Sequence, residues 1–282
     1  MVDRTREFAG VRVPTFIYGT AWKEERTSEL VVQALRAGFR GLDTANQRTH
    51  YREVEVGRVL VEEFARGTLL REEVFVQTKF TFQAAQDHRI PYDPAAPVAH
   101  QVTQSVESSL SHLGLERVDS YLLHGPSQRR GLGASDIEAW SAMEALHDAG
   151  KTRFLGVSNV APNQLTALLR RARVRPAFVQ NRCFAALGWD AAVRDICARE
   201  GLVYQGFSLL TANGQVGRGR VVRDIAQRHG RTPAQVIFRF ALQLGMIPLT
   251  GTTNPHHMGE DLSVYEFELT AGEVRAIERA GI

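Results

Sequence analysis

Several features that mark particular protein classes are scarce in this chain of 282 residues. Its two cysteines, Cys183 and Cys197, are too few for a disulfide framework and do not have the spacing of a metal site. No apolar run approaches the ~18 residues of a membrane span, and residues 1–8 lack the apolar stretch of a signal peptide. The formal net charge of +3 is too small to indicate nucleic-acid binding. We therefore expect a cytoplasmic protein without a nucleic-acid, membrane or metal partner.

Lysine is also scarce in this sequence. Only Lys23, Lys79 and Lys151 occur, so that 31 of the 34 basic residues are arginine. A lysine amine shifts its pKa readily on burial, whereas an arginine guanidinium does not. Lys79 follows an apolar run, so we expect its amine to be buried. This makes Lys79 a candidate catalytic residue.

Short apolar segments alternate with amphipathic segments along the chain. This alternation predicts a (β/α)8 TIM barrel, and the length fits the ~250 residues typical of that fold. We expect strands at residues 16–19, 39–43, 75–79, 118–123, 154–157, 177–180, 202–207 and 246–250, and helices at 27–37, 53–65, 98–112, 136–148, 163–172, 190–200, 220–229, 233–244 and 255–263. A helix at 271–280 is surplus to eight repeats. We expect it to pack outside the barrel of a single domain that spans residues 1–282.

Three of the predicted strands end in an ionisable residue, namely Asp43, Lys79 and His124. Each of them alone could merely satisfy nearby backbone groups, as polar residues at strand ends often do. The carboxyl ends of parallel strands converge on one barrel mouth, however, where the active sites of this fold lie. An ionised group that points inward needs a partner, and Asp43 can pair with Lys79. The three residues together predict an active site.

Two loops after the last predicted strands are candidates for binding phosphate. Residues 213–220 are rich in glycine but lack the spacing of a dinucleotide fingerprint, so a plain flexible turn remains the alternative. Residues 250–255 follow the eighth strand and lead into a helix, which is the usual phosphate position in barrels. Taken together, the loops favour an anion site at the barrel mouth.

Four blocks of the sequence, in this order, resemble the aldo-keto reductases, and the resemblance covers nearly the whole chain. Residues 38–45 are similar to the family's GFRxxDTA block, and residues 76–79 are similar to its lysine motif on the third strand. Residues 119–126 resemble its DxYLxHxP motif, and residues 150–159 resemble its GKxRxxGVSN block. The resemblance implies a (β/α)8 barrel, a nicotinamide cofactor and reduction of a small-molecule carbonyl substrate. We expect a monomer or weak dimer.

The resemblance also implies roles for individual residues. Asp43, Lys79 and His124 match three of the family's four catalytic positions. The cofactor-binding positions that it implies are Ser158, Asn159 and Gln180 for the nicotinamide carboxamide, Phe207 for stacking on the nicotinamide ring in place of the usual tyrosine, and Ser208, Leu210, Thr250, Thr252, Asn254, His257, Glu260 and Asp261 along the rest of the cofactor. A phenyl ring at the stacking position retains the ring contact and lacks only the hydroxyl.

The fourth catalytic position, a tyrosine, lies in a segment that departs from the family pattern. The family places this tyrosine five residues after the aspartate, and here that count leads to Arg48. Counting back from Glu53 leads to His50 instead, and Tyr51 is the only tyrosine nearby. We predict that Tyr51 is the proton donor because the chemistry needs a phenol beside Lys79, with His50 as the competing candidate.

A second departure concerns the adenosine phosphate. The family's KSxxPxR pattern uses lysine and arginine to bind the 2′-phosphate of NADP, but here the first two positions are Leu249 and Thr250, and His257 replaces the arginine. The resemblance implies NADP(H) as the cofactor. Because the lysine and arginine are missing, NAD(H) is the alternative.

The resemblance implies a mechanism in which Tyr51 protonates the developing alkoxide and His124 hydrogen-bonds the carbonyl oxygen. A positive charge on Lys79 is expected to lower the pKa of the tyrosine. The residues expected to line the substrate site are Trp22, His50, Phe80 and Phe82. Two other interpretations remain open: a nicotinamide-binding sensor or regulatory protein with little turnover, and a Schiff-base aldolase with Lys79 as nucleophile.

Overall fold

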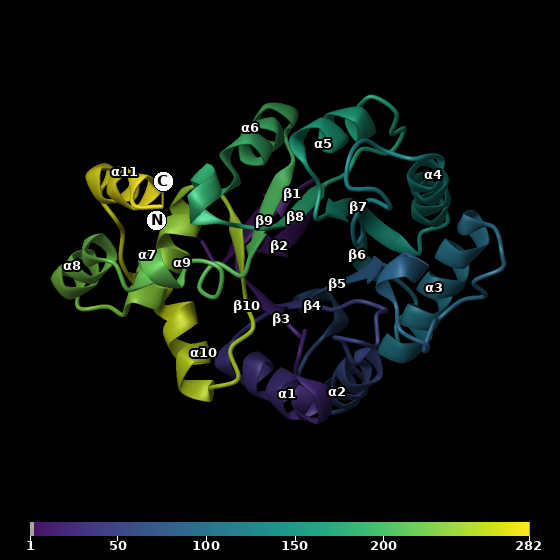
Figure 1. Cartoon of the computed structure of the whole chain (residues 1–282). Coiled ribbons are helices and arrows are strands. Elements are labelled where there is room, and N and C mark those ends of the chain that lie inside the picture. Colours follow the sequence, from purple (N-terminus) through teal and green to yellow (C-terminus); the bar gives the residue numbers. More distant parts are fainter. Residues whose placement is uncertain (1–2, 282) are drawn as a thin grey trace.

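Parallel strands close into a barrel in the computed structural model, which describes residues 3–281 (Figure 1). The eight barrel strands of this region are β3 (Ile17–Gly19), β4 (Gly41–Asp43), β5 (Phe75–Phe80), β6 (Val118–Leu123), β7 (Thr152–Ser158), β8 (Phe178–Arg182), β9 (Val203–Phe207) and β10 (Ile247–Thr250). Each strand pairs with the next one in the sequence, and β10 pairs with β3 to complete the circle. The predicted (β/α)8 barrel is thus confirmed.

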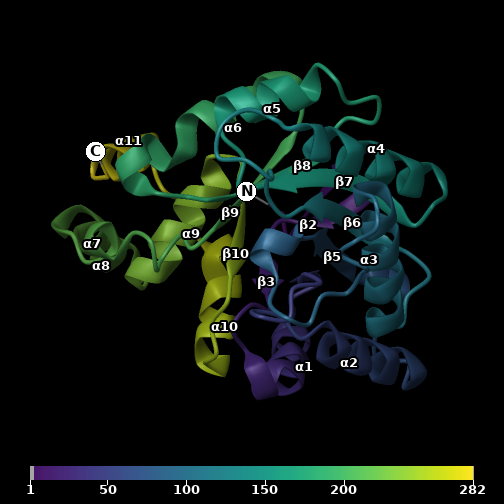
Figure 2. The same ribbon diagram turned by 45° about the vertical axis from the view of Figure 1, so that its right-hand side comes forward.

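Helices surround the barrel on its outer side (Figures 1 and 2). They are α1 (Thr27–Ala37), α2 (Glu53–Ala65), α3 (Val98–Leu113), α4 (Ala134–Asp148), α5 (Pro162–Leu169), α6 (Ala191–Glu200), α7 (Gly214–Gly217), α8 (Arg220–His229), α9 (Pro233–Gln243), α10 (Pro255–Leu262) and α11 (Ala271–Arg279). As expected, the surplus helix α11 lies outside the barrel, where it contacts α8 and α9. None of the helices within residues 3–281 is both long and apolar enough to cross a membrane.

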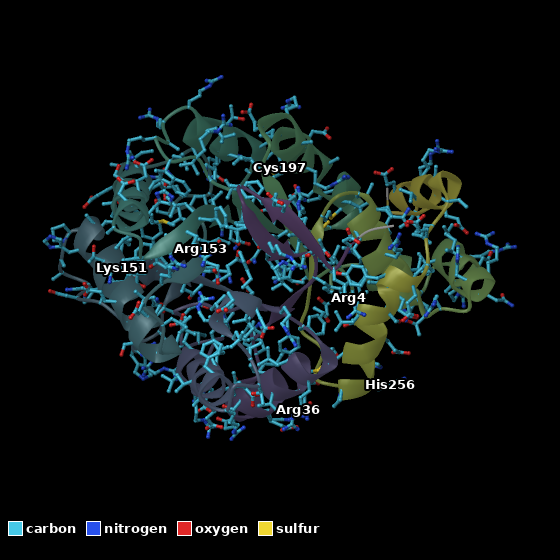
Figure 3. The ribbon with its side chains drawn as sticks, turned by 180° about the vertical axis from the view of Figure 1, so that it is seen from behind. Arg4, Arg36, Lys151, Arg153, Cys197 and His256 are labelled. Atoms are coloured by element: carbon cyan, nitrogen blue, oxygen red, sulfur yellow. The ribbon has the colours of Figure 1, made fainter. Side chains whose placement is uncertain are left out.

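A hairpin of two short strands, β1 (Thr5–Phe8) and β2 (Val11–Pro14), was not predicted from the sequence. It lies across the back of the barrel in Figure 3. Ala9 and Gly10 form the two-residue turn, and both have positive φ angles, 47° and 76°, as a type I′ turn requires. Phe8 packs against the rings of Phe154 and Phe178. The hairpin therefore covers the apolar floor of the barrel, opposite the carboxyl ends of the strands.

Candidate active site

A cavity of about 800 Å³ opens at the carboxyl ends of the barrel strands. Residues at or near the carboxyl ends of six different strands line it: Asp43, His124, Ser158, Gln180, Phe207 and Thr250. This volume is typical of small-molecule and cofactor sites. The strand ends thus bring together side chains that are far apart in the sequence.

A buried ion pair between Lys79 and Asp43 lies at the base of this site. The Nζ atom of Lys79 is 2.7 Å from each carboxylate oxygen of Asp43 and 2.8 Å from the backbone oxygen of Thr44. Gln77 and Gln180 also donate their side-chain N–H groups to the carboxylate, at 2.7 and 3.0 Å. Burial lowers the pKa of Lys79, while attraction to Asp43 opposes that shift. The pairing expected from the sequence is therefore present, and these partners satisfy both charged groups.

The imidazole of His124 lines the cavity and is fixed by a hydrogen bond from the barrel side. Its Nδ1 atom lies 2.7 Å from Oγ1 of Thr81. Burial lowers the pKa of His124 to about 3, and the charges of Lys79 and His50 add to that shift. The ring is therefore neutral at physiological pH and carries one N–H group. A Thr81 hydroxyl that donates to Nδ1 leaves this hydrogen on Nε2.

Tyr51 is half-buried and lies beside the ion pair. Its ring centroid is 5.2 Å from Nζ of Lys79 and 6.0 Å from the ring centroid of His124. Burial raises the pKa of Tyr51 above its ordinary value, and the Asp43 carboxylate raises it further. This direction is opposite to the expected lowering by Lys79, because burial, the larger cause, disfavours the charged phenolate. The phenol therefore stays protonated at neutral pH.

His50, the competing candidate, makes a different set of contacts. Its ring lies 3.8 Å from the Trp22 ring, centroid to centroid, and its Nδ1 atom lies 2.7 Å from Oε1 of Gln47. Trp22 is 66% exposed. Both rings line the cavity, so they lie where the sequence analysis placed substrate contacts. Of the two candidate proton donors, it is Tyr51 whose ring contacts Lys79.

Ser158 at the end of β7 pairs in register with Gln180 of β8, Asn159 follows Ser158, and all three line the cavity. Asn159 donates through Nδ2 to the backbone oxygen of His124 at 2.8 Å and to the Ser158 hydroxyl at 3.1 Å. Its φ angle of +52° lies in the left-handed region, which asparagine tolerates better than most residues. This turn aims three polar side chains at one region of the cavity.

Most of the other expected cofactor positions line the same cavity: Phe207, Ser208, Leu210, Thr250, Thr252, His257, Glu260 and Asp261. Asn254 does not. It is exposed, and its side chain caps α10 by accepting a hydrogen bond from the His256 backbone at 2.9 Å. The Thr250 hydroxyl donates to Asp261 at 2.8 Å. Burial raises the pKa of Asp261 to about 7, and the charge of Glu260 contributes.

Two of the residues expected to bind substrate do not line the cavity. Phe80 is fully buried and packs against Phe82 and Tyr92. Successive side chains of a strand point to opposite faces, so Lys79 faces the barrel interior and Phe80 faces the surrounding helices. Phe82 packs with it, partly buried. The expectation that these rings form an aromatic entrance is therefore corrected.

Two cations of the cavity were not assigned to it from the sequence. Lys23 lines the cavity, and its Nζ atom donates to the backbone oxygens of Gly251 and Ala21, at 2.6 and 3.0 Å. Burial lowers the pKa of Lys23 to about 8. The scarcity of lysine was the signal that could have drawn attention to it. Arg182 also lines the cavity, at the end of β8, and nothing in its sequence context distinguished it from the other arginines.

The chain is similar to aldo-keto reductases over nearly its whole length. The model of the aldo/keto reductase family matches residues 15–282. The chain is 29% identical over 273 residues to a 9,11-endoperoxide prostaglandin H2 reductase of Trypanosoma cruzi, and the aligned region covers 95% of this chain and 88% of that protein. It is 32% identical over 253 residues to an aldo-keto reductase of Mycolicibacterium smegmatis, covering 90% and 84%. A crystal structure of a Bombyx mori aldo-keto reductase in complex with NADP has a TM-score of 0.82 at 24% identity, covering 99% of this chain and 93% of that one.

Proposed function

Because the chain belongs to the aldo/keto reductase family, we propose that it is an NADP(H)-dependent reductase that converts a small-molecule aldehyde or ketone into an alcohol. The observation that carries this proposal is the buried Lys79–Asp43 ion pair, beside which the rings of Tyr51 and His124 line one cavity. Perturbed ionisable groups gathered in a cleft are typical of active sites. Tyr51 is the proposed proton donor.

The free polar atoms of Ser158, Asn159 and Gln180 are complementary to a carboxamide. Within residues 3–281, Oδ1 of Asn159 and Oε1 of Gln180 accept no hydrogen bond, and the Ser158 hydroxyl donates none. A carboxamide offers two N–H donors and one acceptor oxygen, so these three groups fit the nicotinamide amide. When bound, NADPH supplies the hydride, and the protein supplies orientation.

The residues around the reacting carbonyl can supply a proton and a hydrogen bond. Tyr51 is held protonated by its buried surroundings, so it can donate a proton to the oxygen of the substrate. The neutral His124 ring donates one N–H to the same oxygen, where negative charge develops. Asp43 keeps the lysine positioned, and the lysine charge 5.2 Å from the Tyr51 ring stabilises negative charge on the phenol once the proton has left.

The contacts of Lys79 disfavour the aldolase alternative. Its Nζ atom donates to three acceptors, two on Asp43 and one on Thr44. An ammonium group has three N–H donors, so the amine is fully used as a donor and presents no free electron pair. A Schiff base requires that electron pair.

The adenosine end of the cavity is the basis for keeping NAD(H) as the alternative cofactor. Residues 250–261 contain no lysine or arginine. Glu260, Asp261 and the exposed His257 line this end, and Lys23 donates to the backbone oxygen of Gly251. A 2′-phosphate is bound most strongly by arginine or lysine, so these residues are compatible with both cofactors.

The test of the proton donor is the Tyr51→Phe variant. It should reduce kcat at least ~100-fold, the size of a general acid contribution, while the Kd of NADP⁺ measured by calorimetry stays within about twofold. The neighbouring His50→Ala variant should show a smaller fall in kcat than Tyr51→Phe. If Tyr51→Phe remains active and His50→Ala does not, His50 is the donor. NADP⁺ binding without turnover on a broad panel of aldehydes and ketones would instead indicate a sensor or regulatory protein.

A further inference from the structure

Arg182 is the one arginine among the residues that line the cavity. It is the last residue of β8 and pairs in register with Phe207 of β9. Its guanidinium carbon lies 5.5 Å from the centroid of the Phe207 ring, within the range of a cation–π contact. The ring therefore holds the guanidinium at the wall of the cavity.

The charge of Arg182 is not neutralised within the described chain. Among residues 3–281, no carboxylate forms an ion pair with it and no acceptor forms a hydrogen bond with its side chain. Asp43, in contrast, has Lys79 as its partner, and Asp261 accepts a hydrogen bond from Thr250. An arginine carries five N–H donors in a planar fork, and all five remain available at Arg182.

The strand fixes where this charge lies relative to the reacting groups. Gln180, two residues earlier in β8, donates to Asp43 at 3.0 Å. Asn181, between them, points to the other face and binds the backbone of Val160. Gln180 and Arg182 therefore share the cavity face, and two residues of strand rise place Arg182 ~7 Å further toward the mouth.

We propose that Arg182 binds a carboxylate or phosphate group of the substrate, so that the preferred substrates are aldehydes or ketones with an anionic group several bonds from the carbonyl. A planar guanidinium matches such a group with two parallel hydrogen bonds. The Phe207 contact restricts the side chain before the substrate arrives, which lowers the entropic cost of binding. This inference rests on the proposed reductase function and adds the substrate class.

The experiment compares 4-carboxybenzaldehyde with methyl 4-formylbenzoate, which have the same ring and carbonyl but differ in charge. The wild-type protein should have the higher kcat/KM for the carboxylate. The Arg182→Gln variant should lower the ratio of the two kcat/KM values by about 10–100-fold, the size of a charge-assisted pair. The ratio for Arg182→Lys should lie between those of the wild type and Arg182→Gln, because lysine retains the charge but lacks the planar fork of donors.

The matched control is Arg171→Gln. Arg171 is exposed and follows α5, so it lies at the helix end remote from the strand carboxyl ends. This variant removes the same charge and should leave the ratio unchanged. Calorimetric titration of the NADP⁺-saturated protein with 4-(hydroxymethyl)benzoate gives a measure that does not depend on turnover, and its Kd should rise at least tenfold in Arg182→Gln.

Three results would overturn the inference: a wild-type preference for the ester, an equal loss on both substrates, or weaker NADP⁺ binding with an unchanged ratio. The second would mean that Arg182 only supports Phe207, and the third that the bound anion is a cofactor phosphate. If the wild type reduces neither aldehyde, the reductase proposal fails for these substrates. In that case a rise of the 4-(hydroxymethyl)benzoate Kd in Arg182→Gln still supports the anion site, and an unchanged Kd rejects it.

Discussion

At the scale of single residues, the hydrogen bond between Thr81 and His124 determines how the imidazole would meet a substrate in the proposed reaction. Both ring nitrogens of a neutral histidine can carry the hydrogen, and the partner of one nitrogen determines which does. The Thr81 backbone is itself held, because its carbonyl oxygen accepts from the Tyr92 hydroxyl at 2.8 Å and from Gln86 at 3.4 Å. Thr81 is therefore a positioning residue for His124.

We predict that Thr81→Val lowers kcat by about tenfold, the loss expected when one buried hydrogen bond is removed. Thr81→Ser should recover most of the activity, because serine retains the hydroxyl. The pH profile of kcat separates this role from a packing effect: its acidic limb should shift in Thr81→Val and not in Thr81→Ser. A serine variant as impaired as the valine variant would contradict the assignment.

At the scale of elements, two loops brace each other around Tyr51. Gln47 donates to the backbone oxygen of Ala85 at 2.6 Å, and Gln86 donates to the backbone oxygen of Asn46 at 2.9 Å. The next helix, α2, begins at Glu53, whose buried carboxylate accepts from Thr78 and Ser109. The altered segment is therefore held at both of its ends, so that Tyr51 has a defined position although its spacing from Asp43 departs from the family pattern.

The packing of α2 on α3 gives an element-scale prediction. A methyl group on Gly57 of α2 would collide with the backbone at His112 and Leu113 of α3. Gly57→Ala should therefore lower the free energy of unfolding by about 1–3 kcal/mol, as overpacking does, measured by urea denaturation. Gly259→Ala in α10 is the matched control, since its added methyl group meets no atom within 4 Å, and alanine favours a helix over glycine by up to ~1 kcal/mol. Equal stabilities of the two variants would contradict this account.

At the scale of the whole molecule, the two ends of the barrel differ in what they contribute. The floor under the β1–β2 hairpin is apolar, with Val13, Phe75 and Phe178 in one buried cluster. The mouth instead contains the buried Lys79–Asp43 ion pair. It also contains residues with left-handed backbone, namely Trp22, Asn159 and Ser208, with φ angles of 60°, 52° and 56°. Such residues cost stability and persist where function requires them.

The buried carboxyl group of Asp261 allows the stability cost of one residue at the mouth to be measured. Its pKa is about 7 in the folded protein and near 3.8 in the unfolded chain, so the folded state holds the proton more tightly. The contribution of Asp261 to the free energy of unfolding therefore decreases as the pH rises from ~4 to ~7. The Asp261→Asn variant removes this dependence and should raise Tm over the wild type by more at pH 8 than at pH 5. A Tm difference that is constant with pH, or larger at pH 5, would contradict this prediction.

The barrel strands and the Asp43–Lys79 pair were predictable from the sequence because each depends on local patterns and on the convergence of parallel strand ends. The β1–β2 hairpin was not, because Ala9-Gly10 is not one of the dipeptides that usually signal such a turn. The contacts of Arg182 and Lys23 were not predictable either, since they depend on neighbours from distant strands. The outward direction of Phe80 could have been predicted from the sequence, because side chains alternate along a strand and Lys79 was already expected to point inward.

The exposed ring of Trp22 also makes the cavity optically observable. The other two tryptophans of the chain, Trp140 and Trp189, are only 3% and 0% exposed. Collisional quenchers added to the solvent therefore reach Trp22 before the buried indoles. Because this indole packs against His50 in the lining of the cavity, a molecule that enters the cavity shields the one exposed tryptophan. The unlabelled protein thus carries its own reporter of occupancy.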